Sequence, residues 1–185
     1  MEATNNEVTL NLSNLTPKDH ELIMEQCVHQ KATKPEQIAG FTAAYSLAKD
    51  FATNVKWERI ESKDILSLVF KLSTRTEPKE GKSFASVPRV FASGDKAVAP
   101  ENVPQAMQGW AEAFAQNNGT PFALYKEFES IHPFTDGNGR VGDLFWKIAT
   151  QRKTGQWPES LPPTAFGENS YVELVEDSPW GEVIR

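Results

Sequence analysis

The chain has 185 residues, a net charge of −6 and 39% hydrophobic residues, as expected of a globular domain with a buried core. The acidic excess argues against non-specific binding to nucleic acid or to an anionic membrane surface. A single cysteine, Cys27, excludes an intrachain disulfide, and we expect it to be a small core residue. Low cysteine use, no signal-peptide pattern at the amino terminus and no bilayer-length apolar run together favour a cytoplasmic protein without a membrane partner.

Helix signals dominate the first part of the chain. Thr16, followed directly by proline, predicts a helix start. The same type of start recurs at Thr33-Lys34-Pro35-Glu36, and the apolar stripe behind it continues to about Phe51. A third helix is predicted from Ser62, and Pro78 excludes its continuation.

The segment that follows predicts a β-hairpin. Residues favourable in strands lie on both sides of Ser93-Gly94-Asp95-Lys96, a typical turn composition. Pro88 lacks an amide hydrogen, so the first arm is expected to be an edge strand.

Three further helices are predicted after Pro100. The last of them ends at Gly155, and an irregular, proline-rich tail follows. The sequence thus predicts a mainly α protein with one β-hairpin. We expect an N-terminal extension with one helix at 1–35, a core at 36–155 and an irregular tail at 156–185.

The run HPFTDGNGR, from His132 to Arg140, lies between the last two predicted helices. A helix start offers free amides to an anion, and glycine lets the backbone approach a phosphate. Arg140 can add a charged fork, and Asp136 can hold Mg²⁺ together with phosphate oxygens. His132 can accept a proton from a hydroxyl. This combination suits phosphoryl or nucleotidyl transfer.

The run resembles the signature of the Fic family, HPFx(D/E)GNGRxxR, and the eight specified positions within it all match. The resemblance extends over about residues 36–153. It implies a compact α-helical bundle with a β-hairpin flap next to the active-site loop. It also implies Mg²⁺-dependent transfer of AMP, from ATP or another nucleotide donor, to a Ser, Thr or Tyr hydroxyl of a target protein.

The resemblance also implies roles for individual residues. His132 would be the general base, Asp136 would bind Mg²⁺, and Arg140 would contact the diphosphate. The loop that cradles the phosphates would consist of Gly137, Asn138 and Gly139. A flap would hold the target segment as an added strand; its residues are Ser83, Phe84, Ala85, Ser86 and Val87. An inhibitory antitoxin partner is left open.

Asp143 departs from the signature, which has a second arginine there. A carboxylate would repel a γ-phosphate, which leaves three readings: a donor without a γ-phosphate, weak ATP binding, or an inactive member. Asp143 could also lie in solvent near a helix start. The alternatives in function are a non-catalytic nucleotide-binding module and a phosphotransferase or phosphocholine-type transfer. Glycine at 137 and 139, where the phosphotransferase branch has Ala and Lys, favours the nucleotidyl type.

The stretch Thr76–Gly81 matches the family's inhibitory pattern [S/T]xxxE[G/N], with Glu80 as its glutamate. We discount it, because Pro78 opposes the helix on which this pattern normally lies.

Overall fold

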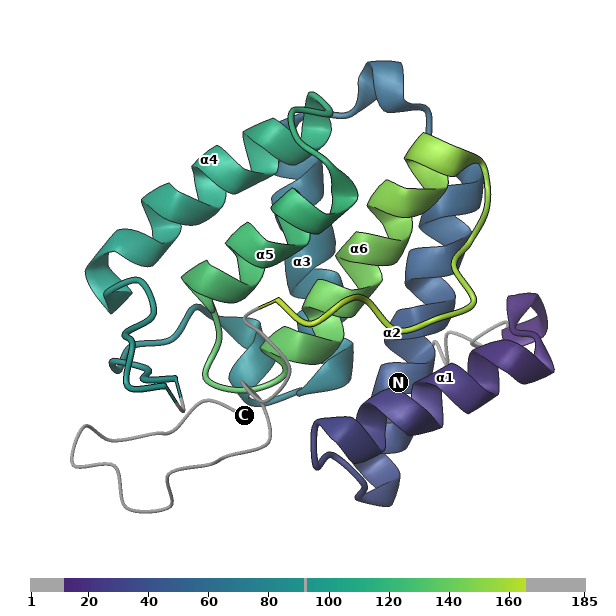
Figure 1. Cartoon of the computed structure of the whole chain (residues 1–185), viewed down its shortest axis with the longest axis horizontal. Coiled ribbons are helices and arrows are strands. Elements are labelled where there is room, and N and C mark those ends of the chain that lie inside the picture. Colours follow the sequence, from purple (N-terminus) through teal and green to yellow (C-terminus); the bar gives the residue numbers. More distant parts are fainter. Residues whose placement is uncertain (1–11, 92, 166–185) are drawn as a thin grey trace, which may run out of the picture.

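The computed structural model describes residues 12–91 and 93–165, which form six α-helices (Figure 1). The helices are α1 (Pro17–His29), α2 (Pro35–Asn54), α3 (Ser62–Thr76), α4 (Val103–Ala115), α5 (Pro121–Ile131) and α6 (Asn138–Thr154). Single 3₁₀ turns lie at η1 (Leu12–Asn14), η2 (Trp57–Arg59), η3 (Glu80–Lys82) and η4 (Pro100–Asn102). The mainly α prediction is confirmed. Parts of the predicted extension and tail, residues 1–11 and 166–185, lie outside the described residues.

Local capping explains where the helices begin. The Thr16 hydroxyl accepts a hydrogen bond from Asp19 N at 3.1 Å, and the Asp19 carboxylate accepts one from Thr16 N at 2.8 Å. Thr120 caps α5 through the amide of Ala123 at 3.0 Å. Helix α2 begins one residue later than its predicted cap, because Lys34 takes the N-cap position.

Helix α6 lies against α2, α3 and α5, so it forms the centre of the bundle. Trp110 of α4 packs against α5 and α6. Its ring centroid lies 5.1 Å from that of Phe128 in α5 and 5.1 Å from that of Phe145 in α6. The Trp110 indole donates to Leu124 O at 2.9 Å, which satisfies its buried N–H group. This packing fixes the end of α5 and the start of α6, and therefore the loop between them.

The predicted β-hairpin is wrong: the described residues contain no strand. Residues 83–91 and 93–98, here called the flap loop, have one isolated antiparallel bridge, between Val90 and Lys96. Pro88 cannot donate to a ladder, and the side chain of Arg89 bonds the carbonyls of Val87 and Val98. The Val87 carbonyl, which would extend the ladder beyond the bond from Ala97 N to Arg89 O, therefore serves a guanidinium instead.

Beyond α6 the chain turns back over the bundle, drawn in yellow in Figure 1. Trp157 packs edge-on against Tyr45 of α2, with centroids 5.6 Å apart, and its indole donates to the Tyr45 hydroxyl at 3.0 Å. The start of the predicted tail is thus irregular but attached to the core. None of the helices in the described ranges has both the length and the apolar content needed to cross a bilayer.

Candidate active site at the α5–α6 loop

The loop between α5 and α6 is held in shape by its own side chains. His132 ends α5 in the left-handed conformation, with φ 50° and ψ 63°. The Asn138 amide bonds Phe134 twice, accepting from its N–H at 2.9 Å and donating to its carbonyl at 2.7 Å. Gly137 precedes α6 with φ 85°, a conformation that favours glycine. The backbone of the loop is therefore set without a ligand.

His132 lies inside this loop, with 1% of its surface exposed. Its Nδ1 is 3.2 Å from Glu129 O. A carbonyl only accepts, so this bond requires the hydrogen on Nδ1 and leaves the lone pair on Nε2. Burial lowers the pKa of His132 to about 3, the bond to Glu129 opposes this shift, and the charge of Arg89 adds to it. The imidazole is neutral near pH 7, which is the form of a general base.

Arg140 is equally buried, with 1% exposed, and only part of its guanidinium is paired. Nη2 donates to Glu77 Oε1 at 2.7 Å and lies 3.5 Å from Asp136 Oδ1. Nε and Nη1 have no hydrogen-bond partner within the described parts of the chain. Unsatisfied buried donors of a cation are costly, so this face of the guanidinium suits an anionic ligand.

The first turn of α6 is closely flanked. A Cβ on Gly137 would lie 3.2 Å from the Glu77 side chain, and one on Gly139 would lie 2.4 Å from Gln30 Oε1. The end of α3 therefore approaches this turn from one direction and the end of α1 from another. Glycine at 139 permits the close approach of Gln30, which a larger residue would displace.

Asp136 is the one acidic residue of the loop, and 48% of its side chain is exposed. Its Oδ1 accepts a hydrogen bond from Gly137 N at 2.7 Å. Partial burial raises the pKa of Asp136, Arg140 lowers it, and Glu77 raises it further. The described residues hold no group of three His, Cys, Asp or Glu side chains able to bind a metal. A divalent ion here would therefore need oxygens from a bound ligand beside Asp136.

Asp143 faces the interior. It is 1% exposed, which makes the reading of a solvent-facing side chain wrong. Its carboxylate accepts from Gln26 Nε2 of α1 at 3.1 Å and pairs with Lys147 one turn further along α6. Burial raises the pKa of Asp143, and both partners oppose that rise. The Asp143 side chain thus links α6 to α1, and its partners differ from those of Arg140.

The predicted flap residues divide into two sets. Ala85 is buried and donates its amide to Pro133 O at 2.8 Å, and Phe84 packs on Phe134 with centroids 5.7 Å apart. The exposed set is Ser83, Ser86 and Val87. The inward residues fix the flap loop on the active-site loop, and the outward ones remain accessible.

Three residues at the site were not expected from the sequence: Gln26, Glu77 and Arg89. Glu77 lies in the inhibitory-like stretch, but it contacts Arg140 in place of the Glu80 that the pattern marks. This stretch ends α3 and continues as a 3₁₀ turn, as Pro78 predicts. Arg89 had a signal that could have been used, since it is the single charged residue in an apolar arm.

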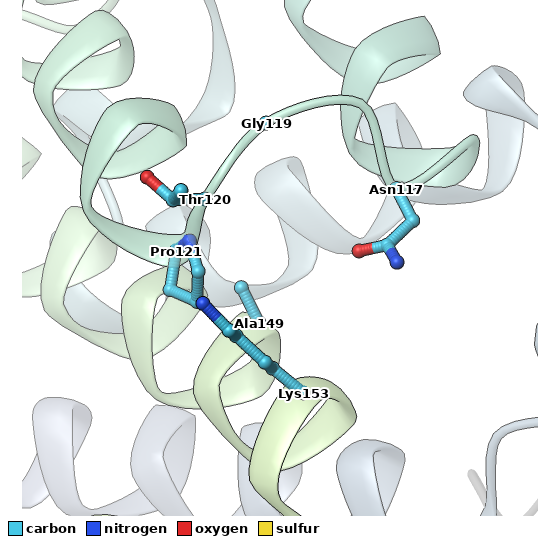
Figure 2. A pocket seen from close by; sticks show the side chains of 6 residues that line it. All are labelled: Asn117, Gly119, Thr120, Pro121, Ala149 and Lys153. Atoms are coloured by element: carbon cyan, nitrogen blue, oxygen red, sulfur yellow. The ribbon is translucent and has the colours of Figure 1, made fainter.

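Two pockets lie elsewhere. One of about 320 Å³ lies between the α4–α5 connection and the end of α6, where Lys153 extends toward Pro121 (Figure 2). It is at the opposite end of α5 from His132, about 16 Å away by helix rise. The other, of about 160 Å³, is lined by α1, Tyr125 and residues 161–164. Neither includes a residue of the α5–α6 loop.

Comparisons with known proteins agree with this fold. The solved structures that share it include three Fic proteins. A Fic family protein from Desulfovibrio desulfuricans is 20% identical, with a TM-score of 0.52; the match covers 80% of this chain and 54% of that one. A Fic domain containing signaling protein from Bacteroides thetaiotaomicron is 18% identical, with a TM-score of 0.58 and coverage of 77% and 70%. Fic-1 from C. elegans is 18% identical, with a TM-score of 0.51 and coverage of 76% and 44%.

The chain thus spans about half of the first and third of these proteins. No curated protein matches it. The family model of the Fic/DOC family matches residues 59–148, which include the flap loop, α5 and most of α6. By this match and by its fold, the chain is similar to proteins of the Fic/DOC family.

Proposed function

We propose that the protein transfers a nucleoside monophosphate, AMP as the first choice, from a nucleotide to a Ser, Thr or Tyr hydroxyl of a target protein. Fic proteins generally modify other proteins by nucleotidyl or phosphoryl transfer. The observation that carries the proposal is Arg140, a buried cation with two unsatisfied nitrogens beside a left-handed glycine at a helix start. These are the elements of a phosphate site.

In this proposal Arg140 and the amides around Gly137 and Gly139 bind the diphosphate part of the donor. Asn138 keeps the amides in place through its two bonds to Phe134. Positioning and neutralisation of phosphate charge supply most of the catalysis in such transfers. A loop that is already ordered contributes to both.

Asp136 would hold Mg²⁺ in concert with the phosphates. Its half-exposed carboxylate fits an ion that keeps several water or phosphate ligands and needs one or two from protein. When bound, Mg²⁺ would neutralise the phosphate charge.

His132 would act on the target. Its Nε2 takes the proton of the hydroxyl as the hydroxyl oxygen forms a bond to the α-phosphorus, and the bond from that phosphorus to the bridging oxygen breaks, releasing pyrophosphate when ATP is the donor. Because His132 is 1% exposed and Phe91 packs on its imidazole, with centroids 5.2 Å apart, the hydroxyl reaches the ring only after neighbouring side chains move. The exposed Ser83, Ser86 and Val87 would contact the target segment.

A second candidate is a nucleotide-binding module that does not catalyse transfer, or one with a different ligand. Two observations favour it: an aspartate stands in place of the second signature arginine, and Glu77 occupies one side of Arg140.

The test compares the parent with His132→Ala and Arg140→Ala, using labelled nucleotides, Mg²⁺ and a cell lysate. His20→Ala and Arg59→Ala, both on exposed positions, are the matched controls. Arg140→Ala should weaken nucleotide binding by about 1.5–3 kcal/mol, the range for hydrogen bonds to charged groups. His132→Ala should abolish transfer and keep binding. A parent that binds nucleotide but labels nothing would establish the binding module.

A further inference from the structure

Arg89 holds the flap loop and the active-site loop together. It is 1% exposed, and all its nitrogens donate to main-chain carbonyls. His132 O accepts twice, from Nε at 3.0 Å and Nη2 at 2.7 Å, and Nη2 also donates to Ile131 O at 3.1 Å. The flap loop supplies Val87 O, to Nη1, and Val98 O, to Nη2, each at 3.1 Å.

This arrangement is unusual for a buried cation. No carboxylate forms a salt bridge with Arg89 within the described ranges, although burying an unpaired charge is expensive. The charge is instead compensated by four carbonyl dipoles, two of them at the negative end of α5. An apolar residue would fill this interior at lower cost, so the presence of arginine points to a role in geometry.

We propose that Arg89 is a positioning residue for His132: its planar fork fixes the His132 peptide, ties it to the flap loop and thereby sets the orientation of the imidazole. The consequence for transfer rests on the proposed function. The fork is essential, because one guanidinium bonds four carbonyls from two loops. A lysine ammonium has three donors at a single point and cannot reproduce that pattern.

The chain contains a matched control for this role. Arg152 donates to Phe114 O at 3.0 Å and Ala115 O at 3.3 Å, at the end of α4, and stacks on Trp57. It caps a helix with the same chemistry but has no contact with His132. Replacing Arg152 therefore shows the effect of losing an arginine that bonds main-chain carbonyls at a helix end but does not contact His132.

The experiment compares Arg89→Gln and Arg89→Lys with Arg152→Gln and Arg152→Lys. At saturating nucleotide, both Arg89 variants should lose transfer about tenfold to a hundredfold, the scale of a misplaced catalytic group, while the nucleotide Kd stays at the parent value. The Arg152 variants should melt at lower temperature and keep the parent rate. Parent-like transfer in both Arg89 variants would overturn the proposal.

A second readout needs no activity. Nitrogen NMR of the imidazoles distinguishes the two neutral tautomers, and the three histidines can be assigned with His20→Gln and His29→Gln. We expect the parent to show hydrogen on Nδ1 of His132, and Arg89→Gln to shift this population while Arg152→Gln does not. An unchanged tautomer overturns the positioning role. If the parent transfers no nucleotide at all, the proposed function fails and this readout still decides on Arg89; Arg89→Lys replaces Arg89→Gln if the latter does not fold.

Discussion

The carboxylate of Glu77 contacts the guanidinium of Arg140 and therefore competes with an anionic ligand for it. Gln37 holds Glu77 there through a second hydrogen bond at 3.0 Å. We predict that Glu77→Gln tightens nucleotide binding by on the order of 1 kcal/mol, because it removes a competing negative charge. Titration calorimetry measures the change.

Glu80→Gln is the control for this prediction, since Glu80 is exposed, lies close in sequence and is the glutamate that the inhibitory pattern marks. Tighter binding in Glu80→Gln with no change in Glu77→Gln would reverse the assignment.

The buried His132 also predicts how stability depends on pH. Its pKa is about 3 in the folded protein and near 6.5 when unfolded, so the unfolded chain binds more protons between these values. Its contribution is complete above pH 6.5 and is lost as pH falls toward 3, at a slope of up to about 1.4 kcal/mol per pH unit. Between pH 6.5 and pH 3, the free energy of unfolding measured with denaturant should fall more steeply in the parent than in His132→Gln. Parallel curves would mean that His132 is not buried as a neutral ring.

The sequence predicted the loop residues better than their partners. The loop from His132 to Arg140 is nine consecutive residues, so its chemistry could be inferred from spacing alone. Its partners come from far away in the chain: Glu77 is 63 residues from Arg140, and Arg89 is 43 residues from His132. Pairings of this kind depend on how the helices pack, which no local pattern encodes.

Among the elements, α1 and α6 are joined by a buried polar cluster, Gln26, Asp143 and Lys147. Removing the carboxylate alone would leave the Lys147 charge buried without its partner. We predict that Asp143→Leu destabilises the protein by about 3–5 kcal/mol and that Asp143→Leu with Lys147→Met recovers most of this loss. Chemical unfolding measures both, and Glu21→Gln, in an exposed pair with Lys18, should change little.

The same double variant tests whether Asp143 acts on a ligand. If the carboxylate repels a terminal phosphate, the ratio of ADP to ATP dissociation constants will change when it is removed. With its contacts directed at α1 and Lys147, we expect an unchanged ratio.

Helices were predicted more accurately than the flap loop for a physical reason. Caps such as Thr16 and apolar stripes act within a few residues, so the helix ends follow from the sequence. The flap loop had strand-forming residues and a good turn, yet it forms a single bridge. Its carbonyls bond Arg89, and tertiary bonding of this kind overrides local preference.

At the scale of the whole molecule, Asp19 connects the N-terminal helix to the bundle. It accepts hydrogen bonds from Tyr45 at 2.9 Å and from Lys49 at 2.5 Å. Burial raises the pKa of Asp19, but the bonds from Lys49, Thr16 and Tyr45 together hold it below its usual value. The stability it contributes is therefore present above the unfolded pKa, near 4, and is lost as pH falls through the lower folded pKa.

We predict that Asp19→Asn lowers the melting temperature at pH 7 and that its difference from the parent shrinks in acid. Asp50→Asn, on the exposed side of α2, is the control and should leave the melting temperature unchanged. If the difference in melting temperature between Asp19→Asn and the parent stays constant down to pH 2, the charge of Asp19 contributes nothing to stability.

The cluster of Gln26, Asp143 and Lys147 also constrains how this sequence can change over evolutionary time. An arginine restored at 143 would meet the Lys147 ammonium in the interior, so the two substitutions can be accepted only together or in a fixed order. We expect descendants of this lineage that carry a basic residue at 143 to have lost the lysine at 147 and to vary at 26. We therefore expect the residue at position 143 to vary together with those at 147 and 26, and a survey of relatives tests this as correlated substitution.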